Sequence, residues 1–300
     1  MDNITVSIIM LTYKHEQFIT RAIEGVVMQQ TNFNWELIIA DDCSPDGTAD
    51  ICNVWSAKYN NIRYIRNSTN LGANRNFVNA YTISKGKYVA LCEGDDFWID
   101  ALKLQKQVDI LEATPSLTGC FHDARVVSVN DDLMQESIIP RDRKQTTIVR
   151  RVDLCSQNIV PTVSLLFRKM GQLPEWFAQI KIGDYALHLL NGRSGNYHLI
   201  NSVMASYRVF PQSNYEALSE ANKAMQKIEM LSYVLSDSIF NLNGMEKYLL
   251  YSNYRSTLDK CKERMADFKE DIRSNMAYIA ENYAGKSFLL ERLRLKLKLA

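Results

Sequence analysis

Three carboxylates stand close together in the first third of the chain. Glu93, Asp95 and Asp96 fall within four residues and follow the apolar stretch 88–92. Such groups repel one another unless a cation neutralises them, and Mn²⁺ or Mg²⁺ would complete its shell with water and phosphate oxygens. The alternative is a solvated acidic turn, which the two aromatic residues after the pair disfavour. We therefore expect Asp95 and Asp96 to bind a divalent metal that neutralises a diphosphate leaving group.

A second acidic pair, Asp41 and Asp42, ends another apolar stretch, residues 35–40. A carboxylate at this place can accept a hydrogen bond from a nucleobase N–H or a ribose hydroxyl. The turn that follows opens a helix, so Asp46 or Thr48 can serve as its cap instead. The two interpretations use different residues, and both are kept.

Two more side chains suit a nucleotide. Tyr13, after Thr12 at the end of the apolar stretch 4–11, offers a ring for stacking on a base, although such a tyrosine more often belongs to the packing. Arg75 follows the polar loop 67–72 and can reach a base carbonyl or a phosphate. Arginines at helix starts are usually solvated, so Arg75 alone is weak evidence.

These residues follow elements that alternate between β-rich runs and amphipathic patterns, which predicts βαβ units with a mostly parallel sheet. The expected strands are residues 4–11, 35–40, 62–66 and 88–92, and the expected helices are residues 16–30, 48–59, 73–84 and 100–113. Polar and acidic residues recur where the strands end. Because ligands of open α/β sheets bind outside the carboxyl ends of the strands, we expect one cleft there.

The rest of the chain has a different pattern. A strand over 118–129, a polar loop over 130–147 and a further strand near 162–167 are expected to form the acceptor half of the same domain. Residues 217–299 contain no proline and show helical apolar spacing, which predicts an all-helical appendage. We therefore expect an α/β domain over 1–212 and a C-terminal helical region over 213–300.

Composition narrows the class of protein. With 46% hydrophobic residues and 35 Lys plus Arg against 34 Asp plus Glu, the chain is expected to fold and to have no nucleic-acid partner. The six cysteines form no C-x-x-C pair, and neither a leader nor an apolar stretch of about 20 residues is visible. We expect a cytoplasmic protein that does not cross a membrane.

Four motifs in a fixed order give a specific resemblance. They are Thr12-Tyr13-Lys14-His15-Glu16, Asp41-Asp42-Cys43-Ser44-Pro45-Asp46-Gly47-Thr48, Asn70-Leu71-Gly72 and Glu93-Gly94-Asp95-Asp96-Phe97-Trp98. Together they resemble the family 2 glycosyltransferases, inverting enzymes of the GT-A fold, over residues 4–210. The resemblance implies that fold and does not extend to the helical region.

The resemblance also implies roles for the residues of the motifs. Tyr13 and Asp42 would contact the nucleobase with support from Thr12 and Asp41, Arg75 would reach the base or the phosphates, Asp95 would face the ribose and sugar of the donor, and Asp96 would bind the metal. In the family an acidic residue beyond the sheet acts as general base, and Ile182-Gly183-Asp184-Tyr185 looks like that motif. Asp184 is therefore the expected base.

The reaction requires a base independently of the family, because an acceptor hydroxyl must lose its proton as it attacks the anomeric carbon. The alternative for Asp184 is a cap of the helix expected over 185–190. One position departs from the family pattern, since Phe210 stands where many relatives have a metal-binding histidine. The metal would then be held by Asp96, diphosphate and water alone, or be replaced in part by a cation such as Arg208.

The resemblance implies transfer of a sugar from a nucleoside diphosphate donor, a UDP-sugar in the first place, to a glycan or lipid-linked glycan in O-antigen or capsule assembly. The alternatives are a sugar nucleotidyltransferase, whose glycine-rich loop is absent from 12–16, and a non-catalytic binding module, which Phe210 favours and Asp184 disfavours. Alternating basic and leucine residues at 291–300 fit either contact with the inner face of a membrane or a subunit contact in a homo-oligomer.

Overall fold

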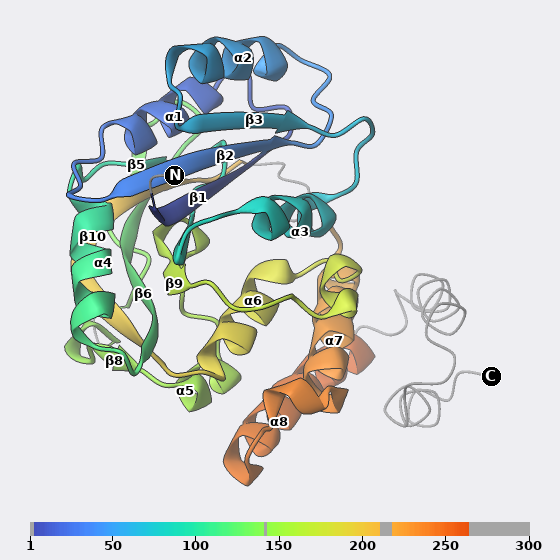
Figure 1. The fold of residues 1–300 in the computed structure, drawn as a ribbon. Helices are drawn as coiled ribbons and strands as arrows, with labels where there is room; N and C mark the ends of the chain where they lie inside the picture. The colour runs from blue at the N-terminus through green and yellow to red at the C-terminus, as the bar shows by residue number, and fades with distance from the viewer. Residues whose placement is uncertain (1–2, 141–142, 211–217, 264–300) are drawn as a thin grey trace.

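A mixed sheet forms the centre of the molecule. The computed structural model describes residues 3–140, 143–210 and 218–263 (Figure 1). Within them the strands pair in the order β3-β2-β1-β4-β9-β6-β10-β5, with β7 beside β6 and β8 beside β10. The strands are β1 (Ile4–Thr12), β2 (Asn34–Asp41), β3 (Ile62–Arg66), β4 (Tyr88–Leu91), β5 (Phe97–Trp98), β6 (Leu117–Val127), β7 (Leu133–Gln135), β8 (Ile148–Val149), β9 (Leu166–Arg168) and β10 (Asn196–Arg208).

The first four strands run parallel to one another, as the βαβ pattern predicts. Their alternating apolar residues feed two cores, one on each side of the sheet. On β1, for example, Ile8 and Met10 pack on one face and Ile9 on the other. The first face is covered by helices α1 (Ile19–Val27), α2 (Thr48–Lys58) and α4 (Lys103–Ala113).

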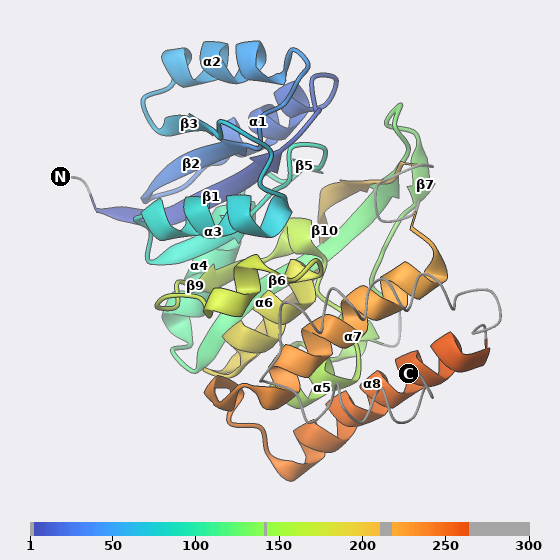
Figure 2. The ribbon, with the colours of Figure 1, turned by 90° about the vertical axis from the view of Figure 1, so that its right-hand side faces the viewer.

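The opposite face carries helices α3 (Ala73–Ile83), α5 (Arg151–Ser156) and α6 (Gly183–Gly192). Figure 2 shows helices α7 (Glu220–Ser236) and α8 (Gly244–Glu263) beside α5 and α6, on this side of the molecule. Both contribute to the same core, through residues such as Leu231 and Leu250. The C-terminal helices therefore complete the packing of the α/β domain within the described residues.

An ion pair fixes α8 to α5. The guanidinium of Arg151 binds both carboxylate oxygens of Glu246, at 2.8 and 2.6 Å, and also donates to the carbonyl of Phe240 at 2.7 Å. Glu246 is buried, so the pair is shielded from water. The expected boundary at residue 212 lies outside the described residues, as does the basic segment 291–300. The division into 1–212 and 213–300 stays a prediction.

The second half of the sheet differs from the sequence-based expectation. The 13-residue strand β10 was not predicted, because its register against β6 shifts around polar Asn201 and Ser202 and breaks the alternation. The strand expected near 162–167 begins with a 3₁₀ turn, and only Leu166–Arg168 joins the sheet. Within the described residues, no helix is both long and apolar enough to span a bilayer.

Candidate active site

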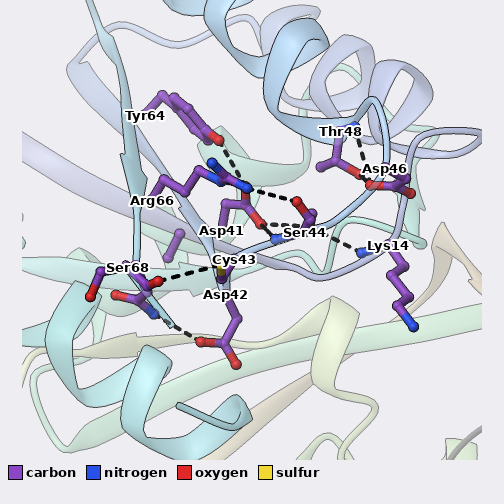
Figure 3. Close-up of polar contacts among 12 residues, drawn as sticks. Lys14, Asp41, Asp42, Cys43, Ser44, Asp46, Thr48, Tyr64, Arg66 and Ser68 are labelled. Carbon is purple, nitrogen blue, oxygen red and sulfur yellow. Dashed lines mark hydrogen bonds and ion pairs between the residues drawn. The ribbon is translucent and has the colours of Figure 1, made fainter. Parts of the chain in front are cut away.

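Two loops at the carboxyl ends of β1 and β2 are bonded to each other. The parallel register pairs Thr12 with Asp41, so the loop after β1 meets the loop after β2. The amide of Lys14 donates to Ser44 Oγ at 3.0 Å, and the amide of His15 donates to Thr48 Oγ1 at 3.0 Å. Figure 3 shows these loops around Asp41, the last residue of β2, and Asp42, which follows it. The first two motifs thus form one structural unit.

Asp41 organises this unit from within. Its Oδ1 accepts from the amide and the hydroxyl of Ser44, at 2.9 and 2.5 Å, and its Oδ2 accepts from Tyr64 Oη at 2.7 Å (Figure 3). Arg66 Nε lies 3.4 Å from the same oxygen. The side chain is fully buried, so both oxygens are committed to the protein. This geometry fits the expected supporting role of Asp41 beside a nucleotide site.

Replacing Asp41 by alanine is expected to destabilise the fold by about 3 kcal/mol, because the buried Ser44 donor and the partly buried Tyr64 hydroxyl lose their acceptor. Urea unfolding followed by circular dichroism measures the loss. Asp50→Asn is a matched control, since Asp50 is exposed in the first turn of α2 and should change the free energy of unfolding by less than about 1 kcal/mol. Equal stabilities of the two variants would contradict the supporting role.

Asp42 instead accepts hydrogen bonds from the loop that contains the third motif, residues 70–72. Its Oδ1 accepts from Asn67 Nδ2 at 2.9 Å and from the amide of Leu71 at 2.8 Å, and its Oδ2 accepts from the amide of Gly72 at 2.8 Å. Gly72 has a φ of 86°, a conformation that favours glycine. A carboxylate offers about four lone pairs, so Asp42 retains capacity for a ligand. The motif residues 70–72 are therefore held at the carboxyl end of β2.

Tyr13 and Arg75 are placed at the edge of these loops. Tyr13 is half-buried, with Lys14 Nζ 5.2 Å from its ring centroid. Arg75 lies exposed in the first turn of α3. Their expected contacts with a base or phosphate stay predictions.

Asp96 is buried next to strand β10. Its Oδ1 accepts from the amide of Arg208 at 2.8 Å, while its Oδ2 has no hydrogen-bond partner in the described structure. The adjacent Asp95 is more exposed, and its Oδ2 lies 3.7 Å from His15 Nε2. The amide of Arg208 thus holds one oxygen of Asp96, and the other oxygen of Asp96 is buried without a hydrogen-bond partner.

The guanidinium of Arg208 is hydrogen-bonded within the protein beside the acidic turn. Its guanidinium donates to the carbonyls of Asp95, Ser128 and Val129, at 2.8, 3.0 and 3.1 Å, and pairs with Asp131 at 2.7 Å. The side chain is almost fully buried, so its donors are committed to the protein. The charge of Arg208 still favours the ionised form of Asp96, so a partial replacement of the metal by Arg208 stays a prediction.

Phe210 closes the same region by packing. Its ring meets that of Phe18 edge-on, with centroids 5.2 Å apart, and the Arg208 guanidinium lies 4.7 Å from the Phe18 centroid. The position at which the family resemblance leads us to expect a metal-binding histidine is therefore apolar here.

His15 is a site residue without an assigned role in the sequence analysis, although it stands inside the first motif. Its Nδ1 and the Oγ1 of Thr12 are buried and have no partner within the described residues. A Cβ added to Gly94 would lie only 2.8 Å from this Nδ1 and 2.9 Å from this Oγ1, so glycine is required for the close approach. Thr12 and His15 thus flank the Asp95-Asp96 turn.

Burial and mutual repulsion disfavour the ionised forms of the carboxyl groups in the acidic turn. Burial, followed by the charges of Asp95 and Asp184, raises the pKa of Glu93 to about 8. Burial, followed by Asp95 and Glu93, raises the pKa of Asp96 well above the ordinary range of a carboxyl. A cation at this turn would reverse both shifts, because it favours the ionised forms.

Asp184 lies in the first turn of α6 and is half-exposed. It does not cap the helix, because Ile182 holds the cap position and no side chain bonds the free amides there. Its Oδ2 accepts from Asn158 Nδ2 at 3.1 Å, and its Oδ1 accepts no hydrogen bond within the described residues. One carboxylate oxygen is fixed and the other is available.

The loop that presents Asp184 adjoins the start of α3. Asn74 Nδ2 donates to the carbonyl of Ile180 at 2.6 Å, and a Cβ on Gly183 would lie 2.1 Å from Asn74 Oδ1. Because α3 begins directly after the loop that Asp42 holds, the Asp42 and Asp184 loops are neighbours. Asn74 is a link that the sequence analysis did not identify.

Asp184 also interacts electrostatically with the acidic turn. Its charge contributes to the raised pKa of Glu93. After burial, the charges of Asp96, Glu93, Asp95 and Asp184 raise the pKa of Tyr207, whose side chain is 41% exposed. Carboxylates from the loop after β4 and from α6 thus act on the same exposed tyrosine at the end of β10.

Residues 7–170 match the sequence profile of glycosyl transferase family 2. The chain belongs to this family. Its central sheet, parallel in the first half, and the covering helices form the GT-A fold.

Two relatives match most of the chain. An uncharacterized protein of Mycobacterium tuberculosis is 35% identical over 203 residues, which cover 67% of this chain and 58% of that protein. The chain thus spans little more than half of this relative. The Escherichia coli UDP-Glc:alpha-D-GlcNAc-diphosphoundecaprenol beta-1,3-glucosyltransferase WfgD is 26% identical over 255 residues, covering 83% of this chain and 92% of WfgD.

Two solved structures share the fold. Staphylococcus aureus TarS 1-349 in complex with UDP-GlcNAc superposes with a TM-score of 0.64 at 15% identity, over 85% of this chain and 72% of that one. The mannosyltransferase PcManGT from Pyrobaculum calidifontis, in complex with GDP-Man and Mn²⁺, superposes with a TM-score of 0.60 at 15% identity, over 96% of this chain and 84% of that one.

The family implies a divalent metal, and the residues present fit one that needs few protein ligands. Within the described residues no three His, Cys, Asp or Glu side chains gather into a metal site. The unsatisfied Asp96 Oδ2 is nevertheless a buried carboxyl oxygen without a hydrogen-bond partner, as a metal ligand would be. With Phe210 apolar, an ion here would depend on Asp96, Asp95, diphosphate and water.

Proposed function

We propose that this family 2 chain transfers a sugar from a nucleoside diphosphate donor, a UDP-sugar in the first place, to a glycan hydroxyl with inversion. The observation that supports this best is the pairing of two kinds of carboxylate. Asp96 offers a buried oxygen without a partner, and Asp184 offers an accessible one whose charge influences the same cluster. The Asp96 oxygen is suited to binding a cation, and the Asp184 oxygen is suited to accepting a proton.

The donor would lie along the carboxyl ends of β1, β2 and β4. Tyr13 and Asp42 would contact the base, with Thr12 and Asp41 holding the loops, and Arg75 would approach the base or phosphates. Asp95 would face the ribose and sugar, and Asp96 would hold the metal. When bound, Mn²⁺ or Mg²⁺ supplies charge neutralisation to the diphosphate as it leaves.

Asp184 would remove the proton of the acceptor. The acceptor oxygen forms a bond to the anomeric carbon, the bond from that carbon to the diphosphate breaks, and the hydroxyl proton passes to Asp184 Oδ1. A base and a leaving group on opposite faces of the sugar produce inversion. An aspartate is a weak base, but it can accept a proton late in the transition state if it is within hydrogen-bond reach.

Surface polysaccharide assembly is the proposed setting. WfgD, by its name, acts on a diphosphoundecaprenol-linked sugar. We propose a glycan or lipid-linked glycan acceptor here too, in O-antigen or capsule synthesis, with the protein in the cytoplasm or at the inner face of the membrane. Contact with the membrane through 291–300 and assembly into a homo-oligomer stay open proposals.

Nucleotide release across a donor panel tests the function against its alternatives. With Mn²⁺ present, we expect UDP to be released from a UDP-sugar such as UDP-glucose or UDP-GlcNAc, and release to fall when EDTA replaces the metal. A non-catalytic module would only raise its Tm with these donors. A nucleotidyltransferase would instead form nucleotide sugar and diphosphate from UTP and a sugar phosphate, and either result would overturn the proposal.

A further inference from the structure

We propose that Asn158 and His188 are positioning residues that hold the carboxylate of Asp184 in the orientation needed to take a proton. The inference rests on the proposed role of Asp184 as base. Asn158 Nδ2 donates to Asp184 Oδ2 at 3.1 Å, and Asn158 Oδ1 lies 2.8 Å from His188 Nδ1. The three side chains form a continuous hydrogen-bonded row.

The helix geometry makes this row possible. Asp184 and His188 are four residues apart on α6, so they lie one above the other on the same helix face. Asn158 comes from the segment after α5 and bridges them. The two elements are fixed to each other, because Tyr185 Oη donates to the carbonyl of Leu154 at 2.7 Å. Tyr197 Oη also donates to the carbonyl of His188 at 2.7 Å, which fixes the helix against β10.

Chemistry sets the direction of every hydrogen bond in the row. An ionised Asp184 only accepts, so the amide nitrogen of Asn158 must face it, and the amide oxygen faces His188. His188 must then donate from Nδ1. Burial lowers the pKa of His188 to about 4, so the ring is neutral near pH 7, with its one proton on Nδ1. Both donors in the row therefore point toward the carboxylate.

The row would fix Oδ2 and leave Oδ1 toward the acceptor. During transfer the acceptor proton moves to Oδ1, and neither Asn158 nor His188 gains or loses a proton. Their contribution is the orientation and stabilisation of the ionised carboxylate, since hydrogen bonds to a charged group are the strong ones. Loss of the row should therefore lower kcat and leave donor binding unchanged.

A double-mutant cycle tests this with a defined probe, UDP release in the presence of Mn²⁺ from the UDP-sugar that the wild type turns over fastest. We expect Asn158→Leu to lower kcat about tenfold with an unchanged KM for that UDP-sugar. In an Asp184→Asn background the same change should have no further effect, because its target is already removed. Thermal unfolding of each variant confirms that the assays are made on folded protein.

Two histidine variants give a matched comparison. His188→Asn places an amide nitrogen near the position of Nδ1 and should keep turnover close to the wild type. His188→Leu removes the donor and should approach the loss seen for Asn158→Leu. A general packing role for His188 would instead make the two variants lose turnover in proportion to their loss of Tm.

The outcomes separate this inference from the function on which it rests. Absence of UDP release from every donor overturns both. An unchanged rate for Asp184→Asn leaves the sugar transfer standing but overturns the role of Asp184 as base, and this inference with it. A slow Asp184→Asn variant in which Asn158→Leu still lowers kcat by the same factor overturns the inference alone, because Asn158 would then act without Asp184.

Discussion

Asp184→Asn is expected to lower kcat by about two orders of magnitude or more while UDP binding stays unchanged. The asparagine can still accept from Asn158, so the loop should keep its structure. It then presents an amide NH₂ where the wild type presents the free Oδ1, and an amide takes no proton from an acceptor. Steady-state kinetics with a UDP-sugar and Mn²⁺ measure kcat, and calorimetric titration with UDP measures binding.

A distant aspartate provides the control for this experiment. Asp109 is exposed on α4, where it accepts a hydrogen bond from Gln105 at 2.7 Å. Asp109→Asn should therefore match the wild type in kcat, KM and Tm. Should Asp184→Asn also match the wild type, Asp184 has no part in the mechanism. A loss of UDP binding together with kcat would point to a structural role of the loop beside Asn74.

The first half of the fold could be predicted because its signals are local. Strands β1 to β4 and the helices between them follow from alternating or helical apolar spacing within each segment, and the predicted bounds differ by a few residues at most. Parallel pairing then brings the ends of β1 and β2 to one edge, with Thr12 opposite Asp41. Sequence pattern and sheet geometry agree here, so motifs 30 residues apart meet.

The different hydrogen-bond partners of Asp41 and Asp42 could not be predicted. The two residues are adjacent in the sequence, but their side chains accept hydrogen bonds from different segments. Asp41 accepts a hydrogen bond from Tyr64, which is 23 residues away. Asp42 accepts one from the amide of Gly72, which is 30 residues away. No local pattern states which of the two faces a ligand. The same holds for Asn158, which reaches Asp184 across 26 residues from a segment without regular structure.

Arg208 illustrates how tertiary contacts decide a role. From the sequence, Arg208 is named as one cation that could replace the metal in part. In the structure its guanidinium donates to the carbonyls of Asp95, Ser128 and Val129. A local sequence pattern cannot indicate these contacts, because the acceptors come from two other segments. Its backbone amide contributes more directly, since it binds the carboxylate of Asp96.

Asp96→Asn is expected to remove the dependence of UDP binding on Mn²⁺ and to lower kcat by a factor of about 10² to 10³. The asparagine oxygen can still accept from the amide of Arg208, so the turn should keep its shape. The side chain then places an NH₂ group where the wild type has the unsatisfied, buried Oδ2. A metal ion cannot bind that group, so the ion would lose its main protein ligand.

Calorimetric titration of UDP with and without Mn²⁺ measures this directly. For the wild type we expect a lower Kd with Mn²⁺, and for Asp96→Asn we expect the two Kd values to agree. Asp109→Asn again serves as control and should keep the full metal effect. If Asp96→Asn keeps the metal effect but loses Tm, Asp96 acts through its bond to Arg208, and the ion binds elsewhere. Equal Tm values with a lost metal effect would place the ion at Asp96, since only the free oxygen differs between the two proteins.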